Sequence, residues 1–228
     1  MRNLPTLLAA LWMLCTSSSA WADRPLVSET ADAITTGTCQ LESALSRDTA
    51  RGTPGRRAWD NLLSCGLAHE TQLAAGYGAA RDSGLSTQAY LLAGKTTLLM
   101  PLSGRTGWGL AYSLGAIKAS GLGLRLDEMQ LVGLATRELA EGLLGHANLG
   151  WNHSRSEHKN RTLWSLGIET TAAFTLAADI FGDDRSRPSV SAGAGYLLGG
   201  GFSVNLSAAL LWARPRVRSL GIGAKLVF

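Results

Sequence analysis

Two stretches at the end of the chain, GFSVNLSAALLWA (201–213) and RVRSLGIGAKLVF (216–228), decide the fold. In both, a large apolar residue stands at nearly every second position, and Ser, Gly, Asn or Ala fills most positions between. Side chains of a β-strand point alternately to its two faces, so this period predicts strands with one apolar and one polar face. The stretch 188–213 is free of charge, but glycines at 199–201 would break a transmembrane helix there.

The same alternation recurs along the chain and predicts twelve strands. An even number of strands of about ten residues each is typical of a transmembrane barrel. We therefore predict an all-β fold, a closed antiparallel up-and-down transmembrane β-barrel of about 12 strands over residues 36–228. The ten further segments are 36–47, 57–66, 69–80, 86–99, 105–117, 126–136, 143–152, 161–171, 173–182 and 189–198.

A soluble β-sandwich is the alternative, because its strands alternate as well. The polar face of a sandwich would carry Lys, Glu and Thr toward water, whereas here that face carries mostly Gly, Ala and Ser. Aromatic residues also lie on the apolar face near strand ends, as in the girdles of membrane barrels. With a periplasmic N-terminus, the expected outer girdle is Trp59, Tyr90, Trp151, Trp164 and Trp212, and the inner girdle is Trp108, Phe174, Tyr196, Phe202 and Phe228.

The N-terminus has the pattern of a secretory signal peptide. Arg2 precedes the apolar run LPTLLAALWMLC (4–15), and Ala20 and Ala22 suit a cleavage site before Asp23. Twelve apolar residues are too few to span a bilayer as a helix. A lipoprotein is the less favoured alternative, because Leu14 before Cys15 is not the small residue that such processing needs. We predict a signal peptide over 1–22, an N-terminal periplasmic segment over 23–35, and the Gram-negative outer membrane as location.

The two ends of the predicted barrel differ in their connections. Extracellular loops of such barrels are usually longer than periplasmic turns. We expect longer, charged connections outside, at 48–56, 81–86, 118–125, 153–160, 183–188 and 213–215, and mostly short ones inside, near 67, 101–104, 137–141, 172 and 199–200.

Positive charge gathers at the outer end, in 47–57, 155–161 and 214–218, within a chain of net charge +4. Phosphates of lipopolysaccharide lie at that height, so outer-membrane lipid and lipopolysaccharide are the expected partners, and nucleic acid is not. A terminal Phe228 is typical of the strand that such barrels present to the insertion machinery.

Two cysteines remain after the signal peptide. Cys39 and Cys65 flank a loop centred on residue 52, so they would lie opposite each other on the first two strands. An oxidising periplasm favours a disulfide between them. The alternative is two free thiols that face lipid.

Several segments of the sequence resemble those of a known group of proteins. The opening RPLVSETADAITTGTCQLESAL (24–45), GKTTL (94–98), GWGLAYSLG (107–115) and HANLGW (146–151) are similar to the "MetA-pathway of phenol degradation" group of outer-membrane proteins. Where that group often has paired aspartates after the opening, this chain has Glu29 and Thr30. The resemblance implies a barrel that passes or binds small, including aromatic, compounds.

Ionisable and amide side chains on the polar face are the candidates for lining the lumen. A charge inside a barrel wall is costly unless it is paired or wet. These residues could line a pore or bind a solute, or they could form ion pairs that hold the barrel shut. Glu42 and Lys225 could meet where the first strand closes on the last. The candidates are Glu42, Lys95, His146, Asn148, Glu169, Asp179 and Lys225.

Catalytic motifs in the sequence lack their required context. Residues 89–96 match a permissive phosphate-loop pattern, but they lie in a predicted strand with no helix after it. The segment WNHSRSEH (151–158) offers His153 with Ser154 or Ser156 for lipid hydrolysis, but adjacent strand residues point to opposite faces. We predict no catalytic residues, cofactor or metal. The preferred hypothesis is a passive channel or binding barrel for small molecules; a structural barrel that contacts lipopolysaccharide is the second, and a lipid-modifying enzyme the third.

Overall fold

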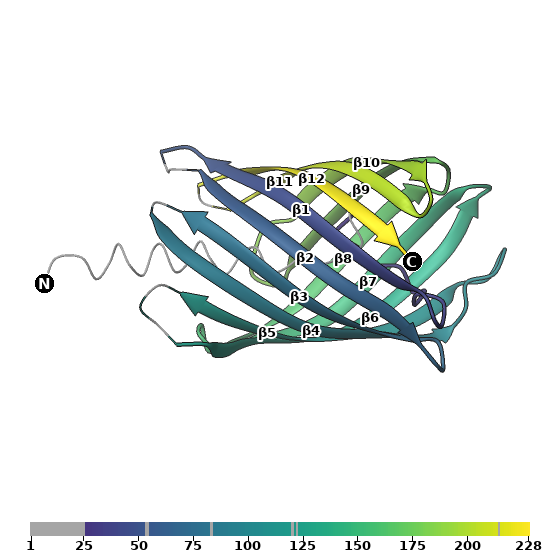
Figure 1. The fold of residues 1–228 in the computed structure, drawn as a ribbon, viewed down its shortest axis with the longest axis horizontal. Helices are drawn as coiled ribbons and strands as arrows, with labels where there is room; N and C mark the ends of the chain where they lie inside the picture. The colour runs from purple at the N-terminus through teal and green to yellow at the C-terminus, as the bar shows by residue number, and fades with distance from the viewer. Residues whose placement is uncertain (1–25, 53–54, 83, 120, 122, 214) are drawn as a thin grey trace, which may run out of the picture.

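The computed structural model of the chain describes residues 26–52, 55–82, 84–119, 121, 123–213 and 215–228. The predicted signal peptide over 1–22 lies outside these residues. Twelve strands run in a single sheet (Figure 1). They are β1 (Cys39–Ala50), β2 (Arg56–Leu67), β3 (Thr71–Asp82), β4 (Leu85–Leu99), β5 (Gly107–Ala119), β6 (Arg125–Ala140), β7 (Leu143–Ser154), β8 (Lys159–Thr170), β9 (Phe174–Asp183), β10 (Ser189–Gly199), β11 (Phe202–Leu211) and β12 (Val217–Val227).

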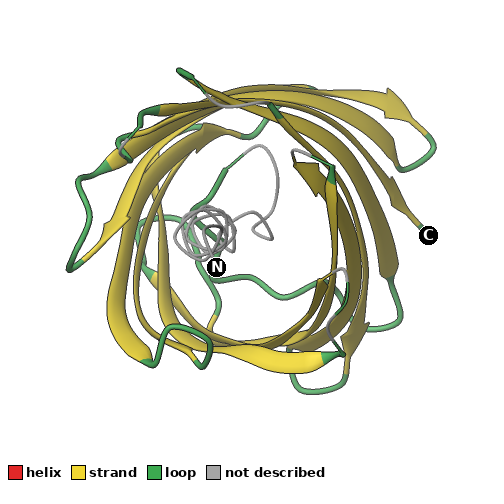
Figure 2. Cartoon of the chain, turned by 90° about the vertical axis from the view of Figure 1, so that its left-hand side faces the viewer, coloured by secondary structure: helices red, strands yellow, loops and turns green. Residues whose placement is uncertain are grey.

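Every strand pairs antiparallel with its neighbours in sequence, and β1 pairs with β12, which closes the barrel (Figure 2). The predicted twelve-stranded barrel is therefore confirmed, and the open sandwich is wrong. The predicted bounds differ from the observed ones by a few residues. The largest difference is in β6, which continues to Ala140 although 137–141 was predicted to be a connection. Its pairing with β7 absorbs the irregular pattern there in a register shift between Glu138 and Ala140.

The outer surface of the barrel is apolar along its whole middle. Leu149 and Leu220 are 65% exposed, and Leu206 is 60% exposed, although all three are large apolar residues in strands. So large a contiguous apolar surface would be unfavourable in water and is matched by lipid. No helix in the described part of the chain is long and apolar enough to cross a membrane.

Aromatic residues border this apolar surface near both ends of the strands. On the outer surface of β2, β3 and β4, the rings of Trp59 and Tyr77 have centroids 6.4 Å apart, and those of Tyr77 and Tyr90 are 5.5 Å apart, both edge-on. The indole Nε1 of Trp59 donates to Ser43 Oγ at 3.1 Å. At the other end, Trp108 and Phe174 stand near the starts of their strands and are more than half exposed.

The connections only partly follow the predicted division into long outer and short inner ones. The expected outer loop at 81–86 is short, because β3 ends at Asp82 and β4 begins at Leu85. The longest connection, residues 100–106, lies at the expected inner end, where a short turn was predicted. This connection is compact, because Arg105 N donates to Leu102 O at 2.8 Å and Gly104 takes a positive φ of 76°.

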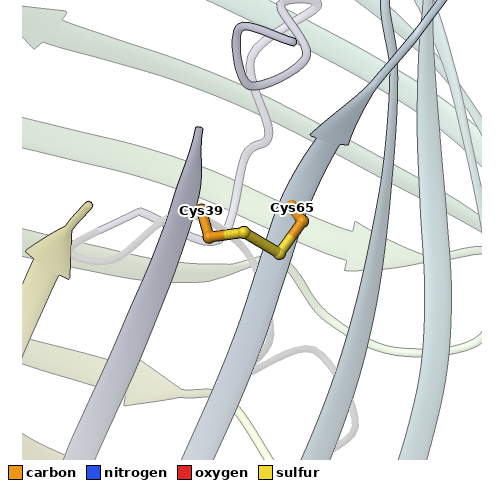
Figure 3. The surroundings of a disulfide bond; sticks show 2 residues. All are labelled: Cys39 and Cys65. Atoms are coloured by element: carbon orange, nitrogen blue, oxygen red, sulfur yellow. A yellow bond between two sulfur atoms is a disulfide. The ribbon is translucent and has the colours of Figure 1, made fainter. Parts of the chain in front are cut away.

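Cys39 and Cys65 form a disulfide, as predicted (Figure 3). The two residues are direct partners in the register of β1 and β2, with Cα atoms 4.1 Å apart. The bond ties the first residue of β1 to the end of β2, and it joins residues that are 26 positions apart in the sequence.

Candidate functional site: the lumen and its internal strap

A segment of the chain before β1 lies inside the barrel. We call residues 26–38 the strap; Figure 2 shows loop segments inside the ring of strands. Within the strap, Leu26 is 4% exposed, and Ser28 and Ala31 are fully buried. The periplasmic location of segment 23–35 stays a prediction, and its residues 26–34 lie against the inner face of the barrel wall. The physical reason is that inward polar side chains supply partners for the backbone of this segment.

The root of the strap lies against β2, beside the disulfide. Gly37 N donates to Gly66 O at 3.1 Å, and Gly66 N donates to Thr38 O at 2.9 Å. A Cβ at position 66 would lie only 2.2 Å from the carbonyl oxygen of Thr35, so the strap needs a glycine there. The strap therefore leaves the wall at the point where Cys65 is bonded to Cys39.

The next part of the strap is held by β3, β4 and β6. Ile34 N donates to Gln72 Oε1 at 2.9 Å, and Ala33 N donates to Thr97 Oγ1 at 2.8 Å. Ala31 is held from both sides, because its N–H donates to Thr136 Oγ1 at 2.8 Å and its carbonyl accepts from Thr97 Oγ1 at 3.0 Å. The Ala31 side chain also packs in a small apolar cluster with Ala111 and Leu134.

The far part of the strap is held by β7 and β9. Asn148 Nδ2 donates to the carbonyl of Glu29 at 3.2 Å. The Asp179 carboxylate accepts from the backbone N–H groups of Val27 and Ser28, the latter at 2.9 Å, and from the hydroxyl of Ser191. Read from residue 34 back to residue 27, the groups that accept from or donate to the backbone lie first on β3 and β4, then on β6, β7 and β9. The strap thus follows the inner wall rather than crossing the lumen at random.

Five of the seven predicted lumen residues belong to this assembly. Asn148 and Asp179 bond the strap backbone, and Lys95 Nζ donates to Thr30 Oγ1 at 3.5 Å. His146 supports Thr136 through its Nδ1, 3.1 Å from the hydroxyl, and its Nε2 lies 3.4 Å from Glu169 Oε1. Four further uncharged residues that hold the strap were not predicted from the sequence, namely Gln72, Thr97, Thr136 and Ser191. The one feature of the sequence that could have indicated them is the two-residue alternation, which places their side chains on the inward face of the strands.

The other two candidates, Glu42 and Lys225, lie away from the strap at the closing seam. They are direct partners in the register of β1 and β12. Glu42 Oε1 also accepts from Gln40 Nε2 at 3.2 Å. The register places Glu42 and Lys225 together, as the sequence suggested; their role in lining a pore stays a prediction.

The wall around this seam is lined by small side chains. At mid-height, four inward residues follow one another across β10, β11, β12 and β1, namely Gly193, Ser207, Gly221 and Ser46. We call the inward residues Glu42, Ser46, Gly193, Gly195, Ser203, Asn205, Ser207, Ser219, Gly221 and Lys225 the bare wall. All are only half-buried, whereas Lys95, Thr97, Thr136, Asn148 and Asp179 on the strapped wall are at most 9% exposed.

The segment 151–158, which offered His153 and two serines for the less favoured hydrolytic alternative, is split between the two faces. His153 Nδ1 lies 2.8 Å from Asn160 Oδ1, and its ring stacks on Trp151 on the outer surface. Ser154 is buried on the inner side, where its hydroxyl lies 3.3 Å from that of Ser156. His153 therefore has its polar contact with an amide, not with a serine. Within the described residues, no three His, Cys, Asp or Glu side chains are grouped to hold a metal.

Comparisons with known proteins extend this description. One family model, described as "Uncharacterised conserved protein UCP029691", matches residues 10–228. This match does not show the phenol-degradation group, so that resemblance stays a prediction. No curated protein matches the chain.

Among solved structures, the chain is similar to barrels of the outer membrane. The KdgM porin in complex with disordered oligogalacturonate superimposes with a TM-score of 0.64 at 8% identity, over 83% of this chain and 99% of that one. The NanC porin superimposes with a TM-score of 0.61 at 8% identity, over 82% of this chain and 98% of that one. The CymD monoaromatic hydrocarbon channel gives 0.55 at 12% identity, over 85% and 89%. At these identities the likeness shows the fold, which is that of outer-membrane channel barrels.

Proposed function

We infer that this chain, which belongs to the family described as "Uncharacterised conserved protein UCP029691", is a passive outer-membrane channel for small molecules whose solute path follows the bare wall. The observation that carries the proposal is the difference between the two sides of the lumen. One side is covered by the strap and buried. The other carries the half-buried bare wall, mostly Ser and Gly, with the buried Ala44 and Gly223 between its members. The proposed orientation places the root of the strap and the C-terminal strand on the periplasmic side, where the insertion machinery would engage Phe228.

The middle of the bare wall supports a path. Ser207 has Gly193 and Gly221 as its direct neighbours on the two flanking strands. Three adjacent residues with so little side chain leave the backbone of the wall close to the lumen. Polar groups there can form hydrogen bonds with water or with a solute, so they avoid the free-energy cost of a buried polar group that has no partner.

The charges of the lumen favour small solutes without a strong net charge. Arg56 Nη1 lies 3.2 Å from Asp48 Oδ2, and Arg161 Nη1 lies 3.5 Å from Asp183 Oδ2, so two inward cations are already paired. Lys95 is 4% exposed and bonded to the strap. Lys225 stands opposite Glu42. This balance supports neutral compounds, including the small aromatic ones that the sequence resemblance implies, over polyanions.

Cysteine modification during conductance measurements tests the path. Ser207→Cys places a thiol on the bare wall, and Ser165→Cys places one on the buried, strapped wall of β8. A charged methanethiosulfonate reagent should lower the current through Ser207→Cys in planar bilayers and leave Ser165→Cys unchanged. Block of the Ser165 variant alone, or of neither variant in a conducting barrel, would show that solutes take another route.

A barrel sealed by its strap is the second candidate, and the hydrogen bonds to residues 27–34 favour it. Such a protein would be a structural barrel that contacts lipopolysaccharide without conducting. Bilayer recordings separate the two candidates, because a folded, inserted barrel that shows no current steps would contradict the channel.

A further inference from the structure

Three arginines form a continuous row on the outer surface, near the end of the barrel where β1 turns into β2. Arg47 and Arg57 are direct partners in the register of β1 and β2, and Arg57 and Arg81 are direct partners in that of β2 and β3. All three side chains are exposed, and they share the faces of Leu45, Trp59 and Tyr77, which point to lipid. We call Arg47, Arg57 and Arg81 the arginine row.

The row is unfavourable for the barrel taken alone. Like charges directly opposite each other in a sheet repel and destabilise the pairing. The ion pairs found among the described residues use other cations; Arg56, next to Arg57 but on the inward face, is the nearest of them and is paired with Asp48. Three adjacent cations on a lipid-facing surface, none in an ion pair with another described residue, therefore indicate an anionic partner outside the protein.

The height of the row identifies the kind of anion. Arg57 stands two residues beyond Trp59, so it lies about 7 Å further along a strand that is tilted to the membrane. Trp59, Tyr77 and Tyr90 mark the edge of the apolar surface. Lipid phosphates lie just outside such an aromatic girdle. On β12, which pairs with β1, Arg218 is exposed on the same surface. Just before this strand, Arg216 Cζ lies 3.9 Å from the centroid of the Trp212 ring.

We propose that the arginine row is a binding site for the phosphate groups of lipopolysaccharide. Guanidinium groups hold phosphate through paired, charge-assisted hydrogen bonds, and neighbouring strands set the three groups side by side along the leaflet. The bound phosphates would remove the repulsion within the row. This site rests on the proposed outer-membrane orientation but is independent of whether the lumen conducts.

The test measures how lipopolysaccharide binds to refolded barrel in neutral detergent, from the rise in thermal midpoint with lipid concentration. The variant Arg47→Gln/Arg57→Gln removes two neighbours of the row, and the matched control Arg105→Gln/Arg137→Gln removes two exposed arginines at the other end. Each arginine near an anionic lipid surface contributes about fivefold to binding, so we expect an affinity loss of about 30-fold for the row variant and little change for the control.

Two further arms make the outcome decisive. Dephosphorylated lipopolysaccharide should bind the wild type as weakly as the row variant binds the intact lipid, and millimolar inorganic phosphate should not reproduce the protection. Equal lipid affinity of row and control variants would overturn the site, as would full protection by inorganic phosphate. Without lipid the row variant should melt no lower than the wild type, which excludes misfolding. Conductance measured on the same samples tells failure of this site apart from failure of the channel.

Discussion

The strapped and bare sides of one barrel wall show that inward polar residues can perform two different tasks. Both sides obey the same alternation, and both carry polar groups toward the lumen. On the strapped side these are Thr97, Thr136, Asn148 and Asp179, each bonded to a backbone group or a neighbour that holds the strap. On the bare side they are mostly Ser and Gly, whose groups stay partly accessible. The difference indicates that the polar side chains bonded to the internal segment are covered by it, whereas the Ser and Gly residues of the bare wall are not.

Removing the strap is the strongest way to break this comparison. A variant that lacks residues 26–34 but keeps the signal peptide and the root at 35–38 should fold, because the strand pairing and the disulfide remain. Its unitary conductance should rise several-fold, since both sides of the lumen are then bare. The measurement is single-channel recording in planar bilayers.

The control for strap removal is a chain of equal length in which residues 26–34 are replaced by a Gly/Ser sequence. Such a segment keeps its backbone N–H groups but loses Leu26 and Ala31, which are buried against the wall. Its conductance should fall between those of the wild type and the deletion. Deletion without any change in conductance would mean that the strap does not restrict the path.

The barrel itself followed from periodicity, because a two-residue alternation and aromatic girdles are local properties that a sequence displays directly. The strap did not. Apolar and polar residues do not alternate in 26–35, and a short polar segment after a signal peptide is usually predicted to lie in the periplasm. Its place in the lumen depends on contacts with Gln72, Thr97, Thr136 and Asp179, which are up to about 150 positions away. Such non-local pairing of a backbone with hydroxyl, amide and carboxylate groups leaves no pattern in one sequence.

For the lumen candidates too, local features could be predicted from the sequence and non-local contacts could not. Parity in the strand pattern indicated that Lys95, Asn148 and Asp179 point inward, and the seam register brought Glu42 opposite Lys225. Whether an inward charge meets water or another part of the chain depends on the strap, so the sequence left pore lining and structural pairing open. The length of connection 100–106 was also missed, because its turn forms through Gly104 rather than through a recognisable two-residue hairpin.

The disulfide at the root of the strap offers a second, smaller perturbation. Replacing Cys39 and Cys65 by serine opens a covalent loop of 26 positions, and the chain-entropy model gives a loss of about 3 kcal/mol in the free energy of unfolding. We also expect the strap to loosen first, because Gly66, next to Cys65, bonds Gly37 and Thr38. Urea unfolding followed by tryptophan fluorescence measures the stability, and proteolysis at residues 26–36 measures strap release.

A matched control separates the two effects of the cysteine pair. Dithiothreitol added to the wild type should reproduce the double serine variant, and added to that variant it should change nothing. Equal protease resistance of the strap in both forms would show that its hydrogen bonds to the wall, rather than the root, keep it in place.

The smallest expected effect concerns the charges of the bare wall. Lys225 faces inward in β12, between Gly223 and the end of the strand, and it stands opposite Glu42. Lys225→Glu would set two acids in register at the seam, and a change of charge close to a hydrated path shifts the energy of a passing cation relative to that of an anion by about 1 kcal/mol, or about fivefold in the ratio of cation to anion permeability. The reversal potential in a salt gradient measures this permeability ratio and should move to the value for a more cation-selective channel. High salt should reduce the change because exposed charges are screened. Arg137→Glu makes the same change of charge on the outer surface of β6 and should leave the ratio unaltered. A shift of equal size in both variants would assign selectivity to the overall charge of the barrel and remove the distinction between the bare wall and the rest of the molecule.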